Sequence, residues 1–219
     1  AHDKLYNCLP MYHSIGGVVA NAAVLLTGGS VVLREKFSAT TFWDDIAQNG
    51  CTIFQYIGEL CRYLLKSDAS HQPNTLRLCC GNGLGADVWA AFQERFAVPQ
   101  ILEFYAATEG SFSLLNVEGK TGAIGRIPPF LAHRLAPAIV KVDASGAAMR
   151  QANGFCVAVE RGKAGEAIGR IAGGAGRFEG YTDAAATENK LLRDVFKPGD
   201  AWMRTGDLMR QDNQGFYYF

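Results

Sequence analysis

A short stretch in the middle of the chain, from Tyr105 to Gly110, combines side chains that could do chemistry together. The ring of Tyr105 offers a flat face for a base, and the hydroxyl of Thr108 suits a phosphate oxygen. The carboxylate of Glu109 is a ligand type that Mg²⁺ prefers. An apolar run, 100–104, leads into these residues, and open α/β sheets bind ligands at the carboxyl ends of their strands. The stretch predicts a nucleotide site, although a strand end followed by a turn explains the same residues.

A glycine-containing stretch, made of Gly81, Asn82, Gly83 and Leu84, follows one strand-like run and precedes a helical pattern. Small residues at the start of a helix let the backbone approach a nucleotide closely. The spacing departs from the dinucleotide fingerprint because position 86 is Ala. Local sequence therefore leaves two interpretations open, a nucleotide contact and a tight strand-to-helix turn.

Two further polar residues lie beside strand-like runs. Asp207 stands at the entrance of such a run and could accept hydrogen bonds from ribose hydroxyls, as acidic residues do in nucleotide folds. An aspartate that caps a turn is the alternative. His13 lies in a loop just after the first run, where a structural histidine is the simplest interpretation.

Several other chemistries are excluded by the sequence. A P-loop ending at Lys120-Thr121 would need glycine at position 114, which is Leu114. No serine lies in a GxSxG pattern, and the four histidines lack metal-ligand spacing. The six cysteines form no CxxC pair, which predicts buried thiols in a reducing compartment.

The composition predicts a globular protein of one domain or two small ones. Hydrophobic residues make up 48% of the 219 residues, enough for a sizeable core. With 21 basic and 21 acidic residues the formal net charge is zero, so we expect no nucleic-acid partner. The longest apolar run, 15–27, is too short to span a bilayer. We expect a cytoplasmic location and leave open whether the full-length protein associates with membranes.

The first half of the chain alternates between strand and helix patterns. This alternation predicts an α/β fold with a mostly parallel βαβ sheet covered by helices. Strands are expected at 5–9, 30–34, 52–55, 76–80 and 100–104, and helices at 16–26, 38–48, 59–66 and 87–96. Ser38 is the expected N-cap of the second helix, and Gly50 its end.

After Gly110 short β-like runs replace the helical patterns and predict a smaller, β-rich, barrel-like unit. Its expected elements are strands at 138–143, 155–160 and 167–171, an extended break at 128–129, a helix at 183–192, and a hairpin turning at 212–215. We therefore expect two subdomains, 1–112 with His13, the stretch 81–84 and the stretch from Tyr105, and 113–219 with Asp207.

The order of the polar stretches is more specific than any one of them. The stretches are Pro10-Met11-Tyr12-His13-Ser14, Gly81-Asn82-Gly83, Tyr105-Ala106-Ala107-Thr108-Glu109, Phe178-Glu179-Gly180-Tyr181 and Trp202-Met203-Arg204-Thr205-Gly206-Asp207. This series resembles the ordered core motifs of the adenylate-forming superfamily, which includes acyl-CoA synthetases, luciferases and peptide-synthetase adenylation domains. Residues 52–65 and 194–202 resemble the very-long-chain acyl-CoA synthetases, also called fatty acid transport proteins.

The resemblance implies a fatty acid–CoA ligase that uses ATP, Mg²⁺ and CoA. The fatty carboxylate attacks the α-phosphate of ATP and expels pyrophosphate, and the CoA thiol then displaces AMP from the acyl-adenylate. It also implies that Tyr105 stacks on adenine, that residues 81–84 line the base and that Asp207 binds ribose. Thr108 would contact the α-phosphate, and Glu109 would hold Mg²⁺. His13 would lie near the acyl carboxylate, so Thr108, Glu109 and His13 are the implied catalytic residues.

Departures from the family pattern matter for activity. Ala106 occupies a position where the family has glycine. The family's phosphate loop is expected before residue 1, and its mobile C-terminal domain with a catalytic lysine after Phe219. We therefore expect a central piece of the large N-terminal domain, truncated at both ends and inactive alone. Alternatives left open are a ligase for another acid such as carnitine or a sterol acid, a lipid-binding or transport module with a vestigial nucleotide site, and, more distantly, a dehydrogenase.

Overall fold

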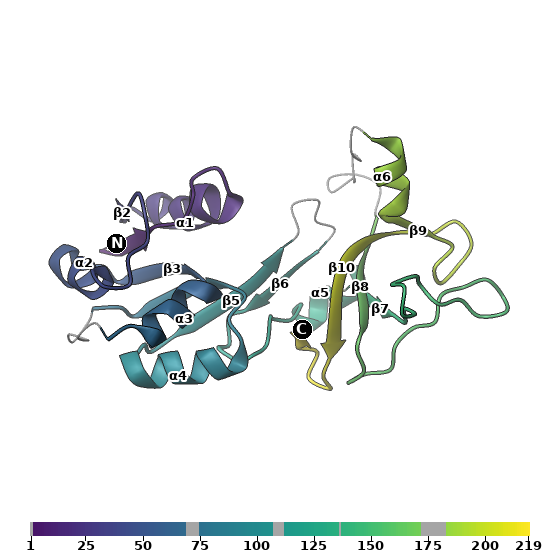
Figure 1. Ribbon diagram of the computed structural model, residues 1–219. Coiled ribbons are helices and arrows are strands. Elements are labelled where there is room, and N and C mark those ends of the chain that lie inside the picture. The colour runs from purple at the N-terminus through teal and green to yellow at the C-terminus, as the bar shows by residue number, and fades with distance from the viewer. Residues whose placement is uncertain (1, 69–74, 107–111, 136, 172–182) are drawn as a thin grey trace. The chain divides into compact units, whose positions relative to one another are not determined.

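The computed structural model describes residues 2–68, 75–106, 112–135, 137–171 and 183–219 (Figure 1). The chain forms two compact units. The first contains Ala1–Phe104 and Asn116–Gly122, and the second contains Tyr105–Leu115 and Ala123–Phe219. Relative to the subdomains expected from sequence, residues 105–112 belong to the second unit and 116–122 to the first. The boundary after residue 112 stays a prediction.

The mostly parallel sheet predicted for the first half is confirmed. Its strands are β1 (Lys4–Asn7), β2 (Ser30–Leu33), β3 (Ile53–Ile57), β4 (Leu78–Asn82), β5 (Ile101–Ala106) and β6 (Ser113–Asn116), in the spatial order β2-β1-β3-β4-β5-β6. Strand β1 pairs in parallel with both β2 and β3, and the pairs β3–β4 and β4–β5 are also parallel. Such strands need helical crossovers, which the intervening sequences supply.

Helices cover both faces of the first unit's strands. They are α1 (Ala20–Leu26), which follows a π-helix η1 (Ile15–Val19), α2 (Phe42–Asn49), α3 (Gly58–Lys66) and α4 (Ala86–Phe96). Successive strand residues point to opposite faces, so Leu5 packs with Val24 of α1 whereas Tyr6 packs with Phe42 of α2. Helices α3 and α4 lie side by side on the same face as α2 (Figure 1).

Aromatic residues dominate the larger core of the first unit. The ring of Phe42 lies edge to face with Tyr6 at 5.1 Å and with Phe54 at 4.7 Å between centroids. All three side chains are completely buried. Each such ring stabilises the fold by on the order of 2 kcal/mol through burial alone.

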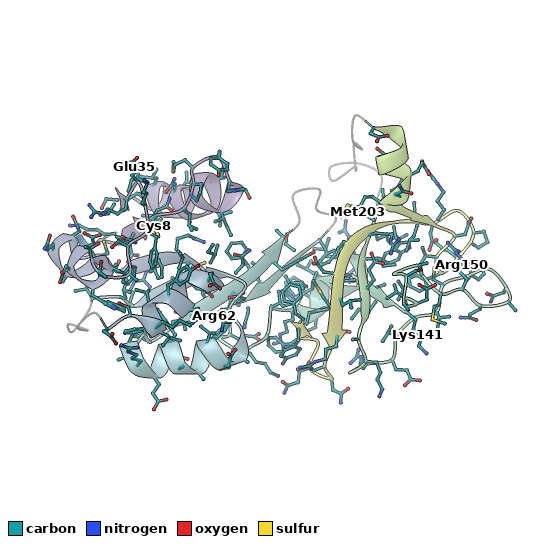
Figure 2. The ribbon with its side chains drawn as sticks, viewed as in Figure 1. Cys8, Glu35, Arg62, Lys141, Arg150 and Met203 are labelled. Atoms are coloured by element: carbon teal, nitrogen blue, oxygen red, sulfur yellow. The ribbon has the colours of Figure 1, made fainter. Side chains whose placement is uncertain are left out.

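The second unit contains an antiparallel sheet, which confirms the expected β-rich part. Its strands are β7 (Ala138–Val140), β8 (Gly165–Arg170), β9 (Leu191–Arg193), β10 (Ala201–Gln211) and β11 (Tyr217–Tyr218), ordered β11-β10-β8-β7 with β9 paired to β10. Two short helices, α5 (Pro129–Leu135) and α6 (Ala184–Asn189), belong to the same unit. The long strand β10 carries Met203, whose side chain is buried (Figure 2).

The structure corrects several local predictions. Ser38 does not cap α2: its hydroxyl accepts a long hydrogen bond from Thr41 N–H in the turn that precedes the helix. Pro129 begins helix α5 instead of extending a break, because proline fits the first turn, where no N–H is needed. Residues 155–160 form isolated bridges and no strand, and the helix expected at 183–192 ends at Asn189, where the chain turns into β9.

All six cysteines are free thiols, and all but the half-buried Cys80 are buried. Burial raises the pKa of Cys8 to about 12 and that of Cys51 to about 11, so these thiols stay protonated at neutral pH. Among the helices in the described ranges, none combines the length and apolar character needed to cross a bilayer.

Candidate functional site

The candidate site residues of the first unit lie just beyond the carboxyl ends of its parallel strands. His13 follows β1, Gly58 follows β3, and Gly83 follows β4. The strand order reverses between β1 and β3, because β2 lies on one side of β1 and β3 on the other. Open α/β sheets bind ligands beyond the carboxyl ends of the strands at such a switch point. The topology therefore makes this edge of the sheet the candidate binding edge.

The loop that carries His13 is held by buried amides. Asn7, at the end of β1, donates from Nδ2 to Gly16 O at 2.8 Å and to Asn21 Oδ1 at 3.1 Å. Its Oδ1 accepts from Leu9 N–H at 3.1 Å. These bonds tie the strand end to the start of the π-helix, so the intervening loop is anchored at both ends. His13 itself is exposed, and the centroid of its imidazole lies 4.5 Å from the centroid of the Tyr12 ring.

The glycine-containing stretch 81–84 is held in place by Glu103 of the neighbouring strand. In the register of β4 and β5, Gly81 lies opposite Glu103, whose Oε1 accepts from Leu84 N–H at 3.1 Å. Oε2 of Glu103 accepts from Tyr56 Oη at 2.5 Å. A Cβ on Gly58 would collide with Gly83 O, so the chain segments after β3 and β4 pack backbone against backbone. Gly81 and Asn82 thus end β4, and Gly83 and Leu84 begin the short connection to α4; these four residues are called the 81–84 turn below.

Burial gives Glu103 an unusual titration. The side chain is almost completely buried, and desolvation raises the pKa of its carboxyl to about 7. The hydrogen bonds from Tyr56 and from the backbone N–H groups of Gly83 and Leu84 oppose that rise, because they favour the ionised form. Strongly shifted pKa values are enriched at functional sites, so Glu103 is a candidate member of this one.

In the second unit, Tyr105 and Asp207 are brought together. Tyr105 Oη donates to Asp207 Oδ2 at 2.6 Å, and both side chains are half-buried. The tyrosine ring stacks on Phe112 at 5.6 Å between centroids and meets Phe219 edge on at 6.2 Å. Among the described residues, Oδ1 of Asp207 has no hydrogen-bond partner. It therefore has capacity for a hydroxyl donor from a ligand.

The sequence context predicts Asp207 at the entrance of a strand, and the structure places it elsewhere. It lies inside β10, where the pairing with β8 shifts register between Arg204 and Leu208. Thr205 Oγ1 donates to Ala167 O at 2.7 Å and accepts from Asp207 N–H at 3.1 Å. The irregular strand segment presents the carboxylate to Tyr105.

Some predicted site residues fall outside the described ranges. These are Thr108 and Glu109, together with residues 178–181 of the fourth motif. Within the described residues, no group of three or more His, Cys, Asp or Glu side chains is arranged to hold a metal ion. The magnesium role of Glu109 stays a prediction.

Sequence reasoning missed the residues that support the predicted ones. From the sequence alone, Glu103 and Asn7 are expected only as strand residues, and Tyr56 only as part of the 52–65 stretch that resembles the very-long-chain acyl-CoA synthetases. A carboxylate within an apolar run such as 100–104 is the signal that could have identified Glu103, since a buried charge requires partners. The contacts of Asn7 with Gly16 and Asn21 had no local signal.

Curated relatives cover the whole chain. It is 42% identical to human long-chain fatty acid transport protein 1 over 224 residues, covering 100% of this chain and 35% of that protein. It is 39% identical over 220 residues to the medium/long-chain-fatty-acid–CoA ligase FadD6 of Mycobacterium tuberculosis, covering 99% of this chain and 36% of the ligase. The chain thus spans about a third of the length of these relatives.

Solved structures share the fold. ATP-bound MatB from Rhodopseudomonas palustris superposes with a TM-score of 0.72 at 23% identity, covering 99% of this chain and 39% of MatB. The AMP complex of Bacillus subtilis o-succinylbenzoate-CoA synthetase (MenE) gives 0.62 at 22% identity, covering 99% of this chain and 40% of MenE. Residues 1–145 match the family described as AMP-binding enzyme, and the chain belongs to that family.

Proposed function

We propose that this chain is the central part of an ATP-dependent ligase that joins a long-chain or very-long-chain fatty acid to CoA. The observation that carries the proposal is the pairing of Tyr105 with Asp207, which gathers an aromatic face and a carboxylate with spare acceptor capacity in a member of the AMP-binding enzyme family. The relatives named for fatty acid transport and fatty acid–CoA ligation support the substrate class.

The proposed reaction has two steps. The fatty carboxylate attacks the α-phosphorus of ATP, the bond to the β-phosphate oxygen breaks, and pyrophosphate leaves. The product is a mixed anhydride whose leaving group is AMP, which makes the acyl carbon a good electrophile. The CoA thiol then forms a thioester at that carbon, losing its proton, and AMP leaves with the anhydride oxygen.

The described residues have distinct proposed roles. The half-buried ring of Tyr105 stacks on adenine, and the free oxygen of Asp207 accepts a hydrogen bond from a ribose hydroxyl. The turn at 81–84 lines the base, with its backbone fixed by Glu103. His13, exposed in its anchored loop, lies near the acyl carboxylate.

Thr108 and Glu109 complete the proposal as ligands of the α-phosphate and of Mg²⁺. Mg²⁺, when bound, neutralises charge on the phosphate oxygens. Peripheral membrane association of the full-length protein is also proposed, because the relatives are named as transport proteins for long-chain fatty acids.

Isothermal titration calorimetry tests the nucleotide site in this chain. We expect saturable binding of AMP, and tighter binding of a non-hydrolysable acyl-adenylate mimic, both lost in Tyr105→Ala and Asp207→Ala. Glu188→Gln is the matched control, because Glu188 is an exposed carboxylate of α6 in the same unit. If a fatty acid binds with the same affinity with or without an attached adenylate, a lipid-binding module would be favoured instead.

A ligase assay tests the reaction and the substrate class. The longer protein that carries this segment is assayed for acyl-CoA formation with acids of increasing chain length, and with carnitine and a sterol acid. Highest kcat/KM with long or very long fatty acids supports the proposal, and a preference for another acid contradicts the substrate class. We expect no turnover by this chain alone, so acyl-CoA formation by it would refute that expectation.

A further inference from the structure

The irregular segment of β10 has a specific cause. In the register with β8, Arg204 lies opposite Ile168 and Leu208 lies opposite Glu166, so four steps along β10 match two along β8. The extra residues form a bulge, and Gly206 in it has a φ of +81°, a conformation that favours glycine. A bulge removes regular ladder partners and must be stabilised by other groups.

Glu166 supplies that stabilisation. Its side chain is only 3% exposed, and its Oε1 accepts from the backbone N–H of Gly206 at 3.1 Å. Oε2 accepts from Arg204 Nη2 at 2.6 Å and from Nε at 3.0 Å. Arg204 Nη2 also donates to Gly146 O. One carboxylate thus binds the residue that begins the bulge and the glycine at its centre.

The bulge leads directly to Asp207. Gly206 is its neighbour, and Thr205 bonds to both Ala167 O and Asp207 N–H. The carboxylate of Asp207 in turn accepts from Tyr105. The hydrogen bond from Glu166 to Gly206 N–H and the backbone of the bulge therefore connect Glu166 to the Tyr105–Asp207 pair.

We propose that Glu166 and Arg204 form a positioning pair, which holds the β10 bulge so that Asp207 meets the nucleotide ribose. The inference rests on the proposed function. Neither side chain touches the ligand in this assignment. Apolar replacement of a buried ion pair is often neutral or stabilising, so the effect of this pair on ligand binding can be measured apart from its effect on stability.

The test uses two variants with different risks. Glu166→Gln keeps the volume and an oxygen for Gly206 N–H but removes the charge that Arg204 pairs with. The double variant E166M/R204M removes the ion pair and the acceptor without leaving a buried charge unpaired. Both are checked for folding by near-ultraviolet circular dichroism. The control R193A/E188A removes the exposed ion pair between β9 and α6 in the same unit.

The measurements are the Kd for AMP in this chain and the KM for ATP and kcat in the longer protein. We expect E166M/R204M to raise the Kd for AMP and the KM for ATP roughly tenfold each, and to leave kcat within about twofold of wild type. We expect E166Q to raise the same two constants roughly threefold. The control should match wild type. A variant that perturbed the whole fold would instead reduce kcat and the folded signal together.

Asp207→Asn separates the two levels of the proposal. If D207N binds AMP as wild type does, the ribose role of Asp207 is wrong, and the positioning pair has nothing to position. If D207N weakens AMP binding while folded E166Q and E166M/R204M do not, the proposed function stands and the positioning pair is refuted.

Discussion

Tyr105 Oη donates a hydrogen bond of 2.6 Å to Asp207 Oδ2, although the two residues are 102 positions apart in the chain. Tyr105 comes from the end of β5, and Asp207 from the bulge of β10. The hydrogen bond to a carboxylate restrains the orientation of this half-buried ring.

The separate contributions of the ring and the hydroxyl can be measured. Tyr105→Phe keeps the stacking surface and removes the bond to Asp207, so we expect AMP affinity to fall about fivefold, corresponding to roughly 1 kcal/mol. Tyr105→Ala removes both and should lower affinity further, by at least another factor of about ten. Calorimetry with AMP measures both. Equal affinities in Y105F and Y105A would contradict a stacking role.

Glu103 should make stability depend on pH. The pKa of its carboxyl is raised to about 7 in the folded chain, from an ordinary value of 4.5. At pH values between 4.5 and 7 the folded state therefore binds more protons than the unfolded state. The free energy of unfolding therefore contains a contribution that is fully present below pH 4.5 and is lost as pH rises through 7. The loss amounts to about 3 kcal/mol at most. Urea denaturation at pH 5 and pH 8 measures it.

Glu103→Gln is the comparison for this titration. Glutamine cannot ionise, so the difference in unfolding free energy between pH 5 and pH 8 should shrink by the contribution of one group. Exposed Glu188→Gln should leave the difference unchanged. An unaltered pH dependence in E103Q would show that another group titrates.

Close backbone packing makes Gly58 intolerant of a side chain. The Cβ of Gly58→Ala would overlap Gly83 O, and the backbone must move to relieve the overlap. We expect the free energy of unfolding to fall by roughly 1–3 kcal/mol, and AMP affinity to fall because the 81–84 turn shifts. Gly85→Ala is the control, since Gly85 has an ordinary extended conformation and its Cβ would meet only the movable Asp87 carboxylate. Thermal and urea denaturation measure the loss of stability in Gly58→Ala and in Gly85→Ala, and equal losses would contradict the close packing at Gly58.

The buried amide of Asn7 should be worth more than an exposed one. Asn7→Ala leaves Gly16 O and Leu9 N–H without this partner in a buried environment, which should cost about 2–3 kcal/mol of stability. Asn49→Ala removes a bond from Asn49 Nδ2 to Asp45 O at the exposed end of α2 and should cost under about 1 kcal/mol. Urea denaturation of both compares them, and similar losses would contradict the anchoring role of Asn7.

The elements of the first unit were largely predictable because their signals are local. Apolar runs that alternate with amphipathic helices specify parallel β-strands and crossovers, and Gly50 ends α2 in the left-handed conformation expected of it. The second unit was predicted less well. Its strand at 155–160 is replaced by isolated bridges, because pairing there depends on partners distant in sequence that no short window contains.

The sequence by itself determined the order of the motifs and their residue types, which is enough to assign the family and to single out Tyr105 and Asp207 as the proposed ligand contacts. Only the tertiary structure decided how those residues are supported. Two sets of contacts depend on β-strand register and burial. One is the hydrogen bond from the 81–84 turn to Glu103, and the other is the positioning pair of Glu166 and Arg204, which bonds to the bulge next to Asp207. Register and burial arise from contacts across the sheet, so a carboxylate's partner and its pKa become definite only when the chain is folded.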